Sequence, residues 1–133
     1  MTDAIREAFN YVCAHLDVYL QYSEANYQKA FLYFLSKLGT CQTEVPLTYT
    51  FNDGSRGQVV FGHGRMDVVF RDKDGEVHII ELKISPKRYA IEQFIPQVKR
   101  YMVHYERTFN KKPKGWIICW SKFGSRCVQV TGP

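Results

Sequence analysis

The apolar positions at the start of the chain repeat with a helical period. Within residues 3–21 they recur every three or four residues, which predicts an amphipathic helix. A second helix is expected after Ser23, a suitable N-cap, with Glu24 in its first turn and Gly39 as its stop. The apolar stripes of the two helices are Ile5, Phe9, Val12, Leu16 and Leu20, and then Tyr27, Ala30, Phe31, Phe34, Leu35 and Leu38.

The middle of the chain changes to strand patterns. Residues 42–51 predict a strand that lies at an edge or bulges at Pro46, because proline has no N–H to donate to a sheet. The sequence DGSRG at 53–57 reads as a loop. Residues 65–70 and 76–84 predict two further strands, joined by a hairpin around the sequence DKDG and stopped by Ser85-Pro86.

The rest of the chain combines one helix with short strands. Residues 87–108 look helical, and Pro96 predicts a break, with the better helix beginning at this proline. KKPKG at 111–115 is a turn, 115–120 a short buried strand, and 128–130 a candidate for another. The order helix, helix, three strands, helix, strand predicts a mixed α/β fold with helices flanking a sheet. At 133 residues, the chain suits one domain rather than two.

Charge is distributed unevenly along the chain. The net charge is +5, but residues 1–81 carry 7 Lys or Arg against 11 Asp or Glu, whereas residues 82–133 carry 11 against 2. This separation favours a polyanionic partner for the C-terminal half, since a generic solubilising surface would mix both signs.

Composition excludes several classes of protein. Hydrophobic residues make up 45% and charged residues 23% of the chain, as in ordinary globular domains. No apolar run is long enough to cross a membrane, and the opening sequence MTDAIREAFN has no apolar signal core. The cysteines form no CxxC pair, which predicts reduced thiols in an intracellular protein of the cytoplasm or nucleus. They are Cys13, Cys41, Cys119 and Cys127.

Charged residues interrupt the two apolar strands of the predicted hairpin. Alternation of side chains puts Glu81 and Lys83 on one face of their strand, beside Val77 and Ile79. Both faces of that strand are mostly apolar, as in a strand that is covered on each side. Asp67 interrupts the preceding strand in the same way. Charges in such positions indicate a site rather than a solvent-facing surface.

The turn decides whether the two acids meet. A three-residue loop over 73–75, closed by Gly75 in the left-handed region, places Asp67 directly opposite Glu81. Their β-carbons would be about 5 Å apart, and the carboxylates would repel by about 3 kcal/mol at an effective dielectric of about 20. A divalent cation removes this repulsion, whereas Lys83 offsets only part of it; oxygen ligands without histidine favour Mg²⁺ or Mn²⁺. A loop of two or four residues would instead put the acids on opposite faces.

Three sequence elements resemble those of a known nuclease superfamily. GRMDVVF, a hairpin and then IIELK resemble the D…ExK signature of the PD-(D/E)xK nucleases. Glu24-Ala-Asn-Tyr27 is similar to the ExxY of the GxxExxY branch, and Gln97-Val-Lys-Arg-Tyr101 to the QxxxY of RecB-like members. The resemblance implies one nuclease-like domain over 1–133. It would have an additional helix at 1–22, a restriction-endonuclease-like core (helix, three-stranded meander, helix, strand) at 23–121, and a C-terminal strand or tail at 122–133.

The resemblance also implies an activity, namely hydrolysis of DNA phosphodiester bonds with Mg²⁺ or Mn²⁺, RNA being less favoured. Asp67 and Glu81 would bind the ion, helped by the backbone carbonyl of Leu82. Lys83 would orient the attacking water and stabilise the developing charge. Glu24 either completes the shell of the metal or water, or is simply a favourable acid in the first turn of its helix.

Supporting roles follow from helical spacing, because Gln97 and Tyr101 share one face of a helix, as do Glu24 and Tyr27. Gln97 would bind the scissile phosphate or the water, with Tyr101 positioning it or packing in the core. Sequence-independent phosphate contacts would come from basic side chains, some of which would only be solvated. These are Arg65, Lys87, Arg88, Lys99, Arg100, Lys111, Lys112 and Lys114.

Two kinds of protein fit these observations: an endonuclease or exonuclease, and a non-catalytic nucleic-acid-binding module that retains the nuclease fold. The set Asp67, Glu81 and Lys83 favours the enzyme, since a binding module has no use for opposed buried acids. Small resolvase-like members of the superfamily are homodimers, so a second copy is an expected partner, as is a separate targeting protein. Trp116 and Trp120 read as core residues rather than base-stacking platforms.

Overall fold

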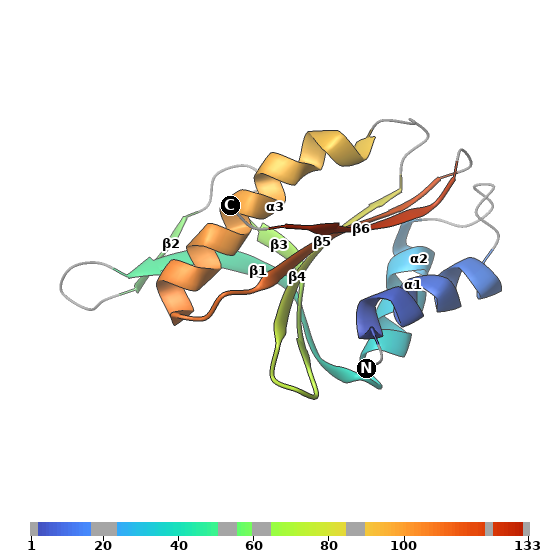
Figure 1. The fold of residues 1–133 in the computed structure, drawn as a ribbon, viewed down its shortest axis with the longest axis horizontal. Coiled ribbons are helices and arrows are strands. Elements are labelled where there is room, and N and C mark those ends of the chain that lie inside the picture. Colours follow the sequence, from blue (N-terminus) through green and yellow to red (C-terminus); the bar gives the residue numbers. More distant parts are fainter. Residues whose placement is uncertain are drawn as a thin grey trace.

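Three helices flank a mixed sheet in the computed structural model, which describes residues 3–16, 24–50, 56–59, 65–84, 90–121 and 124–131 (Figure 1). The helices are α1 (Ala4–His15), α2 (Glu24–Leu35) and α3 (Ala90–Phe109). The strands are β1 (Gly39–Thr50), β2 (Arg56–Val59), β3 (Arg65–Asp72), β4 (Val77–Ile84), β5 (Lys114–Trp120) and β6 (Arg126–Val130).

The strands lie in the order β2-β1-β3-β4-β5-β6. Neighbours are antiparallel except β4 and β5, which run parallel because α3 crosses over between them. β1 changes partner along its length: it pairs with β3 up to Pro46, and from Leu47 onward with β2. β1 has a neighbour on each side and is not the predicted edge strand; the missing N–H of Pro46 instead falls where the ladder with β3 ends. β2 was not predicted, because Arg56 and Gly57 belong to a sequence that reads as a loop.

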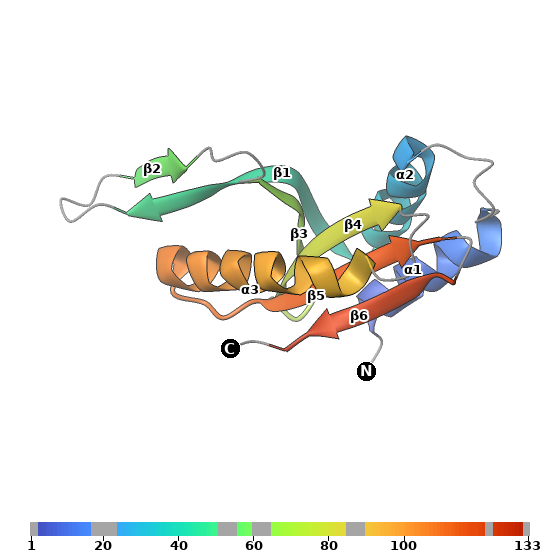
Figure 2. The same cartoon turned by 90° about the horizontal axis from the view of Figure 1, so that it is seen from above.

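The sheet is covered on both faces. α3 lies over one face and α1 and α2 lie over the other (Figures 1 and 2). Alternation along the central strands divides the apolar side chains between two cores. The core under α1 and α2 includes Val68, Phe70, Ile80, Leu82, Trp116 and Trp120. The core under α3 includes Val69, Val77, Ile79, Ile117, Val98 and Met102.

The hairpin between β3 and β4 has the predicted three-residue loop. The N–H of Asp72 donates to the carbonyl of Glu76 over 2.9 Å, and the N–H of Gly75 donates to the carbonyl of Asp72 over 3.1 Å. Gly75 has φ of 82°, in the left-handed region that glycine adopts without strain. The pairing of β3 with β4 follows from this turn.

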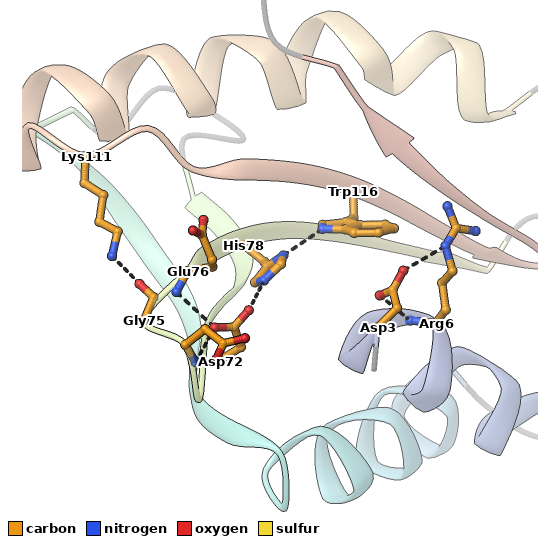
Figure 3. A network of polar contacts seen from close by, with 9 residues as sticks. Asp3, Arg6, Asp72, Gly75, Glu76, His78, Lys111 and Trp116 are labelled. Atoms are coloured by element: carbon orange, nitrogen blue, oxygen red, sulfur yellow. Dashed lines mark hydrogen bonds and ion pairs between the residues drawn. The ribbon is translucent and has the colours of Figure 1, made fainter. Parts of the chain in front are cut away.

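A buried chain of hydrogen bonds fixes the hairpin to the sheet (Figure 3). Asp72 accepts from the N–H groups of Asp74 and Glu76 and lies 2.9 Å from Nε2 of His78. Trp116 donates its indole N–H to Nδ1 of His78 over 2.9 Å. Because indole nitrogen only donates, Nε2 carries the proton of His78 and donates to Asp72. Burial raises the pKa of Asp72, but the hydrogen bonds from His78 and the two N–H groups outweigh it and lower that pKa.

Both N-terminal helices end earlier than predicted. α1 ends at His15 because Leu16 adopts an extended backbone, with φ of −121° and ψ of 139°; the predicted stripe residue Leu20 is outside the described residues. α2 ends at Leu35, and Gly39 is the first residue of β1 rather than a helix stop. Glycine is needed there because a β-carbon would lie 2.2 Å from the carbonyl oxygen of Arg71.

α3 continues through Pro96, so the predicted break is wrong. Proline removes the hydrogen bond to the carbonyl four residues earlier, that of Glu92. Both residues have exposed side chains, so water can bond to that carbonyl. The helix persists because buried residues on both sides of the proline pack on the sheet, Ile91 before it and Val98 and Met102 after it.

Gly115 lets α3 lie close to β5. A β-carbon at this position would be 2.5 Å from Sδ of Met102 and 2.8 Å from Cγ1 of Val98. Gly115→Ala is therefore expected to lower the free energy of unfolding by about 1–3 kcal/mol, measured by urea denaturation. Adding Val98→Ala frees space and should recover part of the loss; equal stability of Gly115→Ala and wild type would contradict this close packing.

Candidate active site

The two acids predicted to meet lie where β3 and β4 separate. Val68 pairs with Ile80 at the end of the ladder between these strands, so Asp67 and Glu81 are the next opposed positions. Beyond this point β3 stays paired with β1, and β4 stays paired with β5. Figure 2 shows β1 and β4 diverging toward their C-terminal ends. The ladder between β3 and β4 therefore ends just before the two acids, and its pairs have the register predicted from the turn.

The carboxylate of Asp67 closes the end of the ladder. Its Oδ2 accepts a hydrogen bond from the backbone N–H of Leu82 over 3.0 Å. That N–H lies past the last β3–β4 pair, so a side-chain oxygen takes the place of a strand carbonyl. The structure thus brings Leu82 to Asp67 through its N–H, and the metal-binding role of its carbonyl stays a prediction.

Glu81 is a buried acid next to a second acid. Its residue is 3% exposed, and burial, followed by the negative charge of Asp67, raises its pKa to about 7. Lys83 opposes this shift, with Nζ 3.4 Å from Oε1 of Glu81. The ammonium also lies 4.6 Å from the ring centre of Phe94 on α3, which holds it over the site. One lysine therefore faces two carboxylates, and a cation would complete the balance of charge.

α3 places Gln97 and Tyr101 over the same face. Tyr101 is fully buried, and Nε2 of Gln97 donates to its hydroxyl oxygen over 2.5 Å. Burial raises the pKa of Tyr101; the Gln97 bond acts against this, and the charges of Glu81 and Asp67 add to it. The structure thus brings these two residues to the acids. Tyr101 both packs in the core and accepts a hydrogen bond from the amide of Gln97, and a role for that amide at a phosphate or a water stays a prediction.

A small pocket gives access to Asp67 from the side of α2. Its volume is about 170 Å³. Gln28 of α2 and Thr43 of β1 supply its polar lining together with Asp67, and Leu32, Val68 and Leu82 supply its apolar lining. Neither Gln28 nor Thr43 was predicted. Gln28 follows Glu24 by one helical turn, and that spacing is the signal that could have found it.

Other predicted residues lie elsewhere or outside the description. Tyr27 is 1% exposed and its ring centre is 5.7 Å from that of Trp120, so it packs in the core under α1 and α2. Trp116 and Trp120 are buried, as predicted. The side chains of Glu24, Arg65, Lys87 and Arg88 are outside the described part of the structure.

The predicted phosphate-binding residues divide into two groups. Lys99 and Arg100 lie on α3 beside Tyr101, and the guanidinium of Arg100 is 5.9 Å from the tyrosine ring centre. Lys114 pairs with His78, three residues before Glu81 on β4, a distance of about 10 Å along the strand. Lys111 donates to the carbonyl of Gly75 in the hairpin turn. The group Lys111, Lys112 and Lys114 is therefore at the turn end of the hairpin, away from the acids.

The donor set suits a hard divalent cation. Among the described residues, no group of three or more His, Cys, Asp or Glu side chains is arranged to hold a metal ion. Magnesium needs no such group, because it binds proteins through one or two carboxylates and keeps water or substrate phosphate as its other ligands. Asp67 and Glu81 meet this requirement, since they come from adjacent strands and face one gap.

The cysteines offer no competing chemistry. None of the four is joined in a disulfide, and Cys119 is buried. Burial raises the pKa of Cys41 to about 11 and of Cys127 to about 12, and it also raises the pKa of Cys13. Thiols with such pKa values are poor nucleophiles at neutral pH.

Comparisons with known proteins add little to this geometry. No family model matches the sequence, and no curated protein resembles it significantly. The crystal structure of a protein called SSO0001 is similar with a TM-score of 0.49 and 15% sequence identity, over 98% of this chain and 76% of that one. A similarity at this level says nothing about function. Of the helices in the described ranges, none is both long and apolar enough to cross a membrane.

Proposed function

We propose that this protein is a metal-dependent nuclease that hydrolyses phosphodiester bonds in DNA. The observation that supports it most directly is the opposition of Asp67 and Glu81 where the sheet opens, with Lys83 beside Glu81. A buried acid beside another acid lowers the stability of a fold, so a protein that keeps such a pair is expected to use it. A module that only binds nucleic acid would have no need to retain this pair, so the arrangement favours catalysis.

The roles of the residues follow from their positions. A magnesium or manganese ion bound by Asp67, Glu81 and the carbonyl of Leu82 would supply an activated water and polarise the phosphate. Lys83 is placed to stabilise the negative charge that develops on the phosphoryl oxygens. Gln97, held by Tyr101, is placed to orient the water or the phosphate.

We also propose that the fold contains a restriction-endonuclease-like core. The run α2, β1, β3, β4, α3, β5 has the order of a restriction-endonuclease-like core, helix, three-stranded meander, helix, strand. In that description, β2 extends β1, β6 adds an edge next to β5, and α1 is the additional helix. DNA is the proposed substrate, with basic residues such as Lys99 and Arg100 on the helix that covers the acids.

A cleavage assay tests the proposal. Labelled single-stranded, duplex, nicked and branched DNA are incubated with the protein in Mg²⁺, Mn²⁺ or EDTA. Products are expected with either cation and not with EDTA. DNA binding without products in any cation would indicate a non-catalytic binding module, and absence of both binding and cleavage would contradict a nucleic-acid function.

Lys83→Met is expected to slow cleavage by about 10²–10³-fold, because it removes the ammonium that stabilises the developing charge. Single-turnover rates at saturating protein measure this loss. Binding of manganese should persist, since the substitution removes a positive charge next to the ligands, and binding of DNA should weaken only slightly because the other basic residues remain. The matched control is Lys37→Met, at an exposed lysine after α2 that contacts Tyr33. If Lys83→Met cleaves DNA at the wild-type rate, Lys83 has no role in the proposed reaction.

A further inference from the structure

A second and larger pocket lies between the C-terminal end of α3 and the strands β1, β3 and β4. Its volume is about 490 Å³, within the range of about 300–1,000 Å³ that is typical of ligand sites. Val69 and Val77 form a buried apolar floor, and Tyr105 and Phe109 form an aromatic wall. Thr40, Gln42 and Arg71 add polar side chains to its lining.

Phe109 is exposed without an evident structural reason. Its residue is 45% exposed, and in the described part of the chain only Tyr33 is another large hydrophobic residue with such exposure. The ring centre of Phe109 lies 4.6 Å from that of Tyr105, which is 8% exposed. The buried tyrosine therefore supports the ring of Phe109, nearly half of which is exposed.

The polar lining carries positive charge and hydrogen-bonding groups. Arg71, Thr40 and Gln42 are all exposed, and none of the described residues that line the pocket is acidic. A guanidinium binds phosphate through paired N–H donors, and an amide both donates and accepts toward the edge of a base. An aromatic wall with such a lining fits a nucleotide better than an aliphatic ligand.

The pocket lies on the α3 face of the sheet, which also carries Glu81. Val77, Ile79 and Glu81 alternate onto that face of β4, and Val77 lines the pocket. Glu81 follows Val77 by four positions, a distance of about 13 Å along the strand. A nucleic-acid strand with one phosphate at the acids would therefore reach the pocket within a few nucleotides.

We propose that this pocket binds an unpaired base of the nucleic acid close to the bond that is cleaved. The base would stack on Phe109 and its phosphate would contact Arg71. This inference rests on the proposed nuclease function and narrows the substrate class to strands with unpaired nucleotides beside the cut. A base within a duplex would have to flip out of the stack to enter.

Fluorescence anisotropy tests the pocket in EDTA, where no cleavage competes. Phe109→Ala is expected to weaken binding of a labelled single-stranded oligothymidylate by about 5–50-fold, with little effect on a blunt duplex. Phe109→Trp should retain binding, because it keeps an aromatic face. Arg71→Gln should weaken binding and reduce the slope of log affinity against log salt by about one. Tyr33→Ala and Arg107→Gln are controls at exposed positions outside the pocket and should change affinity less than twofold.

Abasic substitution separates the possible outcomes. An abasic site walked along the oligonucleotide should weaken binding to wild type at one position, and that effect should vanish in Phe109→Ala. Circular dichroism checks that each variant is folded. If a variant is unfolded, the series of abasic oligonucleotides bound to wild type still tests the pocket. Wild-type binding that is insensitive to the walk and to both substitutions would overturn the pocket and leave the nuclease proposal standing. No binding of the oligothymidylate by wild type would overturn the pocket, and absence of binding and cleavage of every DNA in Mg²⁺ or Mn²⁺ would overturn the nuclease proposal as well.

Discussion

Glu81→Gln is expected to abolish cleavage of DNA and, at the same time, to stabilise the metal-free protein at pH 8. The carboxylate is buried beside Asp67, so the folded state disfavours its ionisation. Glutamine has nearly the same shape and no charge, and it is a poor ligand for a hard cation. The substitution should therefore raise the stability of the metal-free protein while it removes the proposed metal ligand.

The sign and size of the stability change follow from the pKa of Glu81, which rises from an ordinary 4.5 to about 7 on folding. The folded state binds the proton more tightly, so wild type loses stability as pH rises from about 4.5 through about 7. This shift corresponds to about 3–4 kcal/mol. Urea denaturation in EDTA should show Glu81→Gln more stable than wild type by about that amount at pH 8 and equal to it near pH 4.5.

Glu76→Gln is the matched control, because this side chain is exposed. Its effect on stability should stay within about 0.5 kcal/mol at both pH values. If Glu81→Gln is no more stable than wild type at pH 8, the acid is not disfavoured in the metal-free fold. If Glu81→Gln still cleaves DNA at the wild-type rate, Glu81 is not a metal ligand.

Asp67→Ala is expected to reduce cleavage by about 10³-fold or more and to remove manganese uptake in calorimetry, since it deletes a proposed ligand. Its effect on stability should have the opposite sign to that of Glu81→Gln. At pH 5, where Glu81 is largely protonated, the N–H of Leu82 loses its acceptor. The expected loss is about 1–2 kcal/mol. At pH 8 the loss should be smaller, because ionised Glu81 is relieved of a like charge.

Asp67→Asn separates the two functions of this side chain. An amide oxygen can still accept from the N–H of Leu82, so stability at pH 5 should stay close to that of wild type. The charge is gone, so cleavage and manganese uptake should be lost as in Asp67→Ala. If Asp67→Asn binds manganese like wild type, this position is not part of a metal site.

The part of the fold that rests on local rules could be predicted from the sequence. Glycine at position 75 implied the turn, the turn implied the register, and the register placed Asp67 opposite Glu81. The helix faces of Ile5, Val12 and Phe31 followed from their spacing, and all three are buried.

The errors arose where tertiary contacts override local signals. Packing on both sides of Pro96 keeps α3 whole, although proline usually ends a helix. Pairing with β1 turns Arg56 and Gly57 into a strand despite their loop-like sequence. Helical spacing from Glu24 points to Gln28, but Thr43 comes from a different element and meets it only around Asp67 in the folded chain, so no single segment reveals both residues.

The hydrogen bonds from Trp116 through His78 to Asp72 anchor the closed end of the β3–β4 hairpin, far from the separated ends that carry the acids. The turn end of the hairpin is thus held firmly, whereas the other ends of β3 and β4 are joined to different neighbours. Substitutions that break the hydrogen bonds of His78 are therefore expected to change the relative position of Asp67 and Glu81 without altering either acid.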